Sequence, residues 1–135
     1  MIAKTIKYTD FNGTEREEKF FFNLTKAEVT EMELSTSGGL AESITQIIQA
    51  QDTPELIKIF KNLILKSYGE KTLDGKRFRK VDDSGVPLSI AFSETEAYSI
   101  LFMELATDDV KAAEFVNGIM PADMPTNNKP VGVNE

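Results

Sequence analysis

The segment from Phe92 to Asp109, FSETEAYSILFMELATDD, constrains the fold most, because it reads as a helix with almost no polar side. Ser93 and Glu96 have the spacing of a capping box and predict that the helix begins there. Only Ser99 and Glu104 interrupt its apolar side chains. These apolar residues are Ala97, Tyr98, Ile100, Leu101, Phe102, Met103 and Leu105. Such a helix is normally covered on several sides, so it is either a central core helix or a surface shared with a partner.

The amino-acid composition excludes several classes of function. With 135 residues the chain has the size of one domain. Its net charge of −7 argues against nucleic-acid binding, which normally needs a basic patch, and against binding to anionic membranes. The chain has no cysteine and no histidine, which excludes disulfides, thiolate metal sites and Ser-His or Cys-His nucleophiles. It starts without the apolar stretch of a signal peptide and has no apolar run of membrane-spanning length, so we expect a cytosolic-type protein.

Residues 2–23 predict a β-hairpin. A three-residue loop between Asp10 and Thr14, with Gly13 at positive φ, sets the register and places Lys7 opposite Glu17. This register collects five apolar side chains on one face. They are Ile2, Ile6, Tyr8, Phe20 and Phe22. A two-residue turn would shift the register by one residue and scatter them, so we prefer the longer loop.

Three helices are expected after the hairpin. Thr25 and Glu28 predict a capping box for the first, which stops near Ser35. A one-faced amphipathic pattern predicts the second, ending near residue 51. Its apolar residues are Leu40, Ile44, Ile47 and Ile48. Pro54 predicts the start of the third, and Gly69 its end.

Residues 69–91 are polar and rich in glycine, and we expect a long mobile loop there. The loop contains the main basic cluster, for which we expect a role in neutralising acidic faces of this chain or of a partner. The cluster is Lys76, Arg77, Arg79 and Lys80. A last short helix follows, capped by Thr107 or Asp108 and ended by Gly118. Residues 120–135 hold three prolines and little apolar content, which predicts a disordered tail.

The predicted fold is therefore α+β and mainly α, with an N-terminal β-hairpin packed on about five short helices. We expect a single globular domain over residues 1–119, with the hairpin at 2–23, the helical part at 25–119 and a flexible tail at 120–135.

No motif in the sequence carries recognisable chemistry. The chain has no nucleophile elbow, Walker loop, dinucleotide-binding glycine motif or zincin motif. Its clustered carboxylates fit solvated faces and loops better than a metal site or a catalytic pair. They are Glu28, Glu31 and Glu33, and Asp74, Asp82 and Asp83. The sequence favours a protein that is not an enzyme and needs no cofactor or metal.

Three segments of the chain resemble a known protein family. They are KTIKYTDFNGTEREEKFFFNLTKAEV, LIKIFKNLILKSYGEKTLDGKRFRK and FSETEAYSILFMELATDDVKAAEFVNGIMPAD. Together they cover most of residues 3–124, and the chain resembles the tail assembly chaperones of long-tailed bacteriophages. ILKSYGEK with DGKRF, ELATD and NGIMPADM carry most of the likeness. The stretch 81–91, VDDSGVPLSIA, departs from the family pattern and looks like a variable insertion.

The resemblance implies a binding protein. Such chaperones bind the long helical tape measure protein, keep it soluble and help tail-tube subunits assemble around it. They act in the host cytoplasm and are not retained in the finished virion. In many such phages a frameshift makes a longer minor product, and the tail from Met120 would suit that extension. The resemblance carries over no individual functional residues.

A chaperone for an amphipathic helix needs adaptable apolar side chains at its surface. The candidates in this chain would serve equally well as core. They are Met32, Tyr98, Phe102, Met103, Phe115 and Met120. Self-association through the apolar helix is a further expectation. The alternative function is an acidic, DNA-mimic inhibitor of a host nucleic-acid enzyme, supported by the charge of −7, and a carboxylate-only enzyme ranks third.

Overall fold

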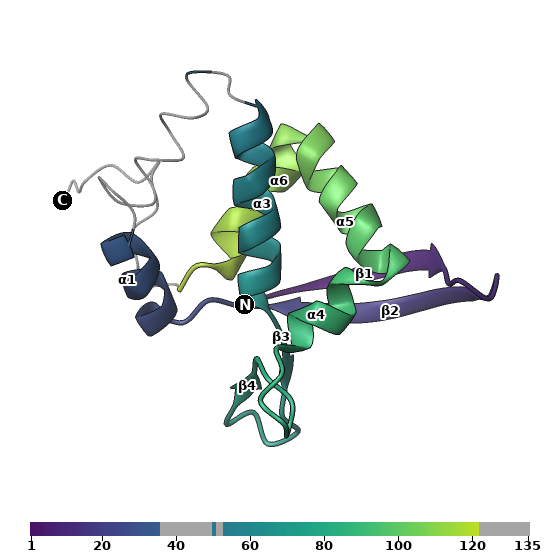
Figure 1. The fold of residues 1–135 in the computed structure, drawn as a ribbon, viewed down its shortest axis with the longest axis horizontal. Coiled ribbons are helices and arrows are strands. Elements are labelled where there is room, and N and C mark those ends of the chain that lie inside the picture. Colours follow the sequence, from purple (N-terminus) through teal and green to yellow (C-terminus); the bar gives the residue numbers. More distant parts are fainter. Residues whose placement is uncertain (36–49, 51–52, 122–135) are drawn as a thin grey trace.

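The computed structural model describes residues 1–35, 50 and 53–121. Within these residues the chain forms an α+β fold with a four-stranded antiparallel sheet and five helices (Figure 1). The elements in chain order are β1 (Ile2–Thr9), β2 (Glu15–Phe22), α1 (Lys26–Ser35), α3 (Thr53–Ser67), β3 (Tyr68–Lys71), β4 (Phe78–Arg79), α4 (Leu88–Ser93), α5 (Glu96–Thr107) and α6 (Asp109–Ile119). The helix expected from Leu40 to residue 51, apart from residue 50, and residues 122–135 of the tail expected at 120–135 lie outside the described residues; Met120 packs against the core.

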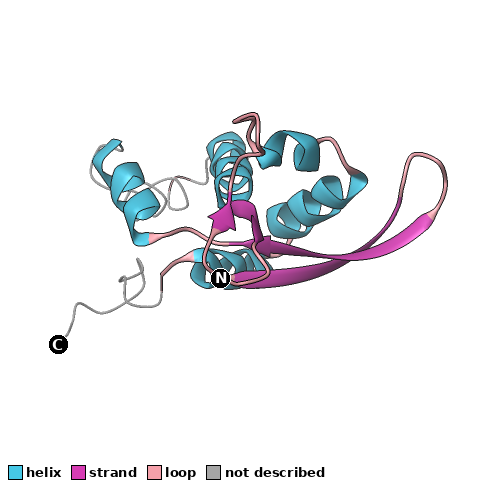
Figure 2. Ribbon diagram, turned by 90° about the horizontal axis from the view of Figure 1, so that it is seen from below, coloured by secondary structure: helices cyan, strands magenta, loops and turns pink. Residues whose placement is uncertain are grey.

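The predicted hairpin and its register are confirmed. Ile2 pairs with Phe22 and Lys7 with Glu17. The amide of Asp10 donates to the carbonyl of Thr14 at 2.8 Å, which closes the loop. The paired strands run out beyond the helices to their turn (Figure 2).

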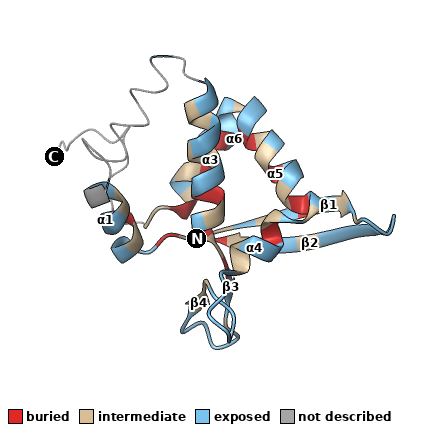
Figure 3. Ribbon diagram, viewed as in Figure 1, coloured by how far each residue is buried: buried red, intermediate tan, exposed pale blue. Residues whose placement is uncertain are grey.

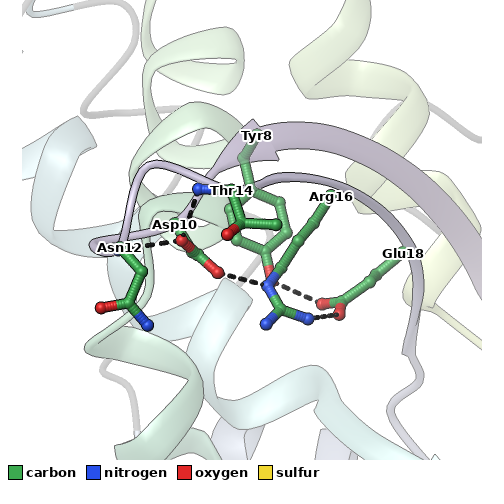
Figure 4. A network of polar contacts seen from close by, with 6 residues as sticks. All are labelled: Tyr8, Asp10, Asn12, Thr14, Arg16 and Glu18. Carbon is green, nitrogen blue, oxygen red and sulfur yellow. Dashed lines mark hydrogen bonds and ion pairs between the residues drawn. The ribbon is translucent and has the colours of Figure 1, made fainter.

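A polar network fixes this turn (Figure 4). Asp10 Oδ1 accepts hydrogen bonds from the amides of Asn12 and Thr14, each at 2.9 Å. Arg16 Nε donates to Asp10 Oδ2 at 2.6 Å, and the Tyr8 hydroxyl donates to Glu18 Oε1. The Arg16 guanidinium, followed by the Thr14 amide, holds the pKa of Asp10 below its ordinary value. Glycine at 13 has φ +82°, as the register required.

The expectation of a long loop over residues 69–91 is wrong. β3 extends the sheet through pairing of Phe21 with Gly69, and β4 pairs with β3. Gly69 makes this possible because a Cβ there would lie 2.5 Å from Cε2 of Phe78 and 2.6 Å from the carbonyl oxygen of Arg79. The short α4 follows, a helix that the sequence pattern did not predict.

The polar residues of this stretch make tight turns instead. Asp74 Oδ1 accepts from the hydroxyl of Thr72 at 2.6 Å and from the amide of Lys76 at 3.0 Å. Asp82 Oδ1 accepts from the amides of Ser84 and Val86 at 2.8 and 3.0 Å. Both are side-chain turns in which an aspartate replaces a backbone acceptor.

The helix starts are partly as predicted. The capping box of Thr25 and Glu28 is confirmed, with both reciprocal bonds formed at 2.8 and 3.2 Å. Asp108 caps α6 through the amides of residues 110 and 111. The expected capping box at Ser93 is wrong, because Ser93 ends α4, and Thr95 caps α5 by accepting from the amide of Tyr98 at 3.2 Å.

The core lies between one face of the hairpin and the helices. Phe22 is 0% exposed, and its ring meets Phe92 of α4 and Phe115 of α6 at centroid distances of 5.8 and 5.3 Å. On the same face of β1, Lys4 forms an ion pair with Glu104 of α5 at 3.1 Å. Buried residues gather along the lower part of α3 and the inner side of α5 (Figure 3).

Candidate partner-binding surfaces

Helix α5 is buried along one side only, so its all-round apolar character leaves side chains at the surface. Ala97, Leu101 and Leu105 repeat every fourth residue and are at most 2% exposed. Ile100 and Met103 are 43% and 54% exposed. They lie three residues apart and are therefore neighbours on the helix surface. The sequence left open whether this helix belonged to the core or to a partner surface; its Ala97–Leu101–Leu105 side packs in the core, and a partner on the other side stays a prediction.

Two predicted residues connect this exposed side to the core. Tyr98 and Phe102 are half-buried, and their ring centroids lie 5.9 Å apart. Tyr98 also meets the buried ring of Phe92 edge-on at 5.8 Å. Burial raises the pKa of Tyr98, so its hydroxyl is neutral at physiological pH. With the exposed Ile100 and Met103, these rings give α5 four apolar side chains outside the fully buried core, which we call the α5 patch (Tyr98, Ile100, Phe102 and Met103).

The remaining predicted residues lie elsewhere. Phe115 is 2% exposed and packs in the core, so it is not part of any surface. Met120 is half-buried at the end of α6. Met32 is half-buried on α1 and lines a groove that the sequence gave no means of locating.

This groove has a volume of about 650 Å³ and lies between α1, α3 and the segments that flank β4. We call it the α1–α3 groove. Apolar and charged side chains alternate around it. Its lining residues are Leu24, Glu28, Glu31, Met32, Asn62, Leu65, Lys66, Tyr68, Lys80, Val81, Pro87 and Ser89.

Lys80 connects the two walls of the groove. Its Nζ contacts Glu28 Oε2 on α1 at 2.8 Å and donates to the carbonyl of Lys66, in the last turn of α3, at 2.6 Å. Burial by itself favours the neutral form of Glu28. The hydrogen bonds from Lys80 and from the Thr25 amide outweigh that effect and lower the pKa of Glu28. The expected neutralising role of the basic cluster is met within the chain by Lys80 and by Arg79, which pairs with Asp83 at 2.8 Å.

The described residues offer little for chemistry. Residues 1–35, 50 and 53–121 contain no group of three carboxylates or other ligands arranged to hold a metal ion. No described helix has the length and apolar character needed to cross a membrane. Every buried side-chain nitrogen or oxygen in the described part has a hydrogen-bond partner, so none is left aimed at a ligand.

Comparison with known families gives one match. Residues 1–131 match the profile of a family described as phage tail assembly chaperone. No match was found among curated proteins or among solved structures.

Proposed function

Because the chain belongs to the phage tail assembly chaperone family, whose members are not enzymes, we propose that it binds the tape measure protein of its phage. In this proposal the chain keeps the tape measure protein soluble before the tail is built. It then presents that protein to tail-tube subunits, so that the tube polymerises around it. The chain acts in the host cytoplasm and leaves before the virion is complete.

The observation that supports this proposal is the α5 patch. A side chain such as Met103 has a flexible thioether that adapts to varied apolar partners. An exposed apolar row on an otherwise well-packed helix is typical of a surface that a partner covers. The charge of −7 keeps a chain with such a patch soluble while the patch is free.

Within residues 1–35, 50 and 53–121, the arrangement of charges gives no support to the alternative of an acidic DNA mimic. Such a decoy needs unpaired carboxylates massed on one face. Here several carboxylates pair with cations of the same chain: Asp10 with Arg16, Glu28 with Lys80, and Glu104 with Lys4. We therefore do not extend that alternative.

The test is co-expression with the tape measure protein encoded by the same phage. We expect the tape measure protein to be insoluble alone and soluble, in a complex, with the wild-type chain. The variant Ile100→Ser/Met103→Ser should lose most of this effect. Leu73→Ser is the matched control, because it removes a fully exposed apolar side chain far from α5 in the β3–β4 turn. A tape measure protein that is soluble alone and fails to bind the wild-type chain would contradict the proposal.

A further inference from the structure

We propose that the α1–α3 groove is the seat of one client helix, and that it selects an amphipathic helix with basic residues on one flank and acidic residues on the other. This inference rests on the proposed function and assigns the part of the tape measure protein that the chain recognises. The α5 patch then supplies a second, less selective contact.

Apolar side chains in the lining of the groove suit the apolar stripe of a helix. The groove has a volume of about 650 Å³. Leu24 is 1% exposed at its base, and Leu65, Tyr68 and Met32 are half-buried along it. Helices dock in such grooves through apolar anchors spaced three and four residues apart.

The two walls of the groove carry opposite charge. The α1 wall presents Glu31, which is exposed, beside Glu28. The wall formed by the end of α3 and by the segment that follows β4 presents Lys66, which is also exposed, beside Lys80. Lys80 and Glu28 neutralise each other, so Glu31 on α1 and Lys66 on α3 remain as lining charges of opposite sign.

The charges of the two walls indicate which kind of helix the groove binds. A helix with lysines on one flank and glutamates on the other meets a favourable charge on both walls, whereas a helix with one sign on both flanks meets repulsion on one wall. Turning the helix end to end exchanges its flanks, so the walls also fix the direction in which the helix runs. A second copy of this chain is a poorer occupant, because two chains of charge −7 repel each other.

The walls are held at a fixed spacing at the base of the groove. The amide of Asn23 donates to the carbonyl of Ser67 at 2.7 Å, and the amide of Leu24 donates to the carbonyl of Ile119 at 2.9 Å. With the bridge from Lys80 to Glu28, these bonds anchor the start of α1 to the body. The groove is thus formed before a client arrives.

The test uses three fluorescent 18-residue helical peptides of one apolar pattern with the full chain. One peptide carries lysine on one flank and glutamate on the other, and the others carry lysine or glutamate on both. We expect the mixed peptide to bind the wild-type chain most tightly. Glu31→Lys should weaken its binding by up to about fivefold, the effect of one exposed ion pair, and should favour the all-glutamate peptide.

The double variant Glu31→Lys/Lys66→Glu is decisive. It exchanges the charges of the walls, so it should restore binding of the mixed peptide, with the helix running the opposite way. Both side chains are exposed, so thermal stability should change little. If the double variant binds the mixed peptide as poorly as the single variant, peptide affinity does not depend on matching wall charges and the inference is wrong.

A second pair of variants tests the groove without changing charge. Val81 lines the groove and Val86 does not, yet they are 44% and 45% exposed in the same turn. Val81→Ser should reduce peptide affinity severalfold, and Val86→Ser should leave it unchanged. Equal effects of the two variants would overturn the inference, as would a change of oligomeric state in place of a change in peptide binding.

The outcomes separate this inference from the proposed function. If the tape measure protein binds, and loses binding with Ile100→Ser/Met103→Ser but not with the groove variants, the inference fails and the proposed function stands. If the wild-type chain does not bind the tape measure protein at all, the proposed function fails.

Discussion

Replacing Lys80 by methionine should loosen the attachment of α1 and destabilise the fold measurably. The Nζ of Lys80 bridges residues that are 52 and 14 positions away in the chain, Glu28 and Lys66. Methionine keeps most of the apolar stem but removes the charge and both hydrogen bonds. The change therefore tests the bridge itself and not the packing around it.

The size of the destabilisation follows from how far Lys80 and Glu28 are exposed to solvent. The side chains of Lys80 and Glu28 are 24% and 32% exposed, so solvent screens their attraction and the ion pair is worth about 0.2–1 kcal/mol. The hydrogen bond to the Lys66 carbonyl adds about 1 kcal/mol, below the roughly 1.5–3 kcal/mol of hydrogen bonds to charged groups, because this bond is exposed to solvent. The sum, about 1–2 kcal/mol, should lower Tm by about 4–10 °C for a chain of this size.

Urea and thermal unfolding, followed by far-UV circular dichroism because the chain lacks tryptophan, give the free energies of unfolding. A double-mutant cycle with Glu28→Gln isolates the ion pair. Glutamine keeps the capping-box acceptor for the Thr25 amide, so only the charge is lost. We expect a coupling energy of about 0.5–1 kcal/mol. Additive effects of the two substitutions would refute the bridge.

The same pair makes stability depend on pH. The pKa of Glu28 is lowered in the folded state, because the hydrogen bonds from Lys80 and Thr25 outweigh the burial that raises it. The unfolded chain therefore takes up this proton at a higher pH than the folded chain does. The stabilisation is present above the ordinary pKa of 4.5 and is lost as the pH falls through the lower folded pKa. Below pH about 5, the Tm of Glu28→Gln should fall less steeply than that of the wild type.

Three further substitutions test the fold by thermal or urea unfolding. Leu101→Ala should lower the free energy of unfolding by about 2–5 kcal/mol, because Leu101 is 1% exposed. Met103→Ala, on the other side of α5, should lower it by less than about 1 kcal/mol. Equal losses would contradict the one-sided burial of α5. Gly69→Ala should lower the free energy of unfolding by at least about 1–3 kcal/mol, because the added Cβ would overlap the Phe78 ring and a backbone oxygen. Unchanged stability of this variant would contradict the β3–β4 pairing. Asp108→Ala should cost about 0.5–2 kcal/mol by removing the cap of α6, whereas no change would show that this cap is unimportant.

Local chemistry made the hairpin and two helix starts predictable. The observed register of residues 2–23 gathers Ile2, Ile6, Tyr8, Phe20 and Phe22 on one face, and Gly13 supplies the positive φ that this register needs. The capping residues Thr25 and Asp108 bond to amides within three positions, so neighbouring residues specify them completely.

The errors arose where distant contacts decide the structure. β4 has two residues and α4 has six, too short for a periodic pattern to show. Thr95 prevails over Ser93 as the cap of α5, because Phe92 is held in α4 by its stacking on Tyr68, with ring centroids 4.3 Å apart. A contact between residues 24 positions apart leaves no trace in the local sequence.

The sequence predicted an apolar surface, but not where in the fold it lies. The sequence showed that α5 had more apolar residues than one buried face needs, and the exposure of Met103 follows from that excess. It did not show which residues face outward, and Phe115 lies in the core. The α1–α3 groove combines side chains from α1, α3 and the flanks of β4, which only the folded chain brings together.

Hydrogen exchange of the full chain, alone and bound to the tape measure protein, measures whether α1 and α5 contact the client. Binding should slow amide exchange in α1 and in the exposed turns of α5, with little change in the β1–β2 turn, which its own polar network already holds. A saturated complex in which neither α1 nor α5 gains protection would show that neither surface binds the client.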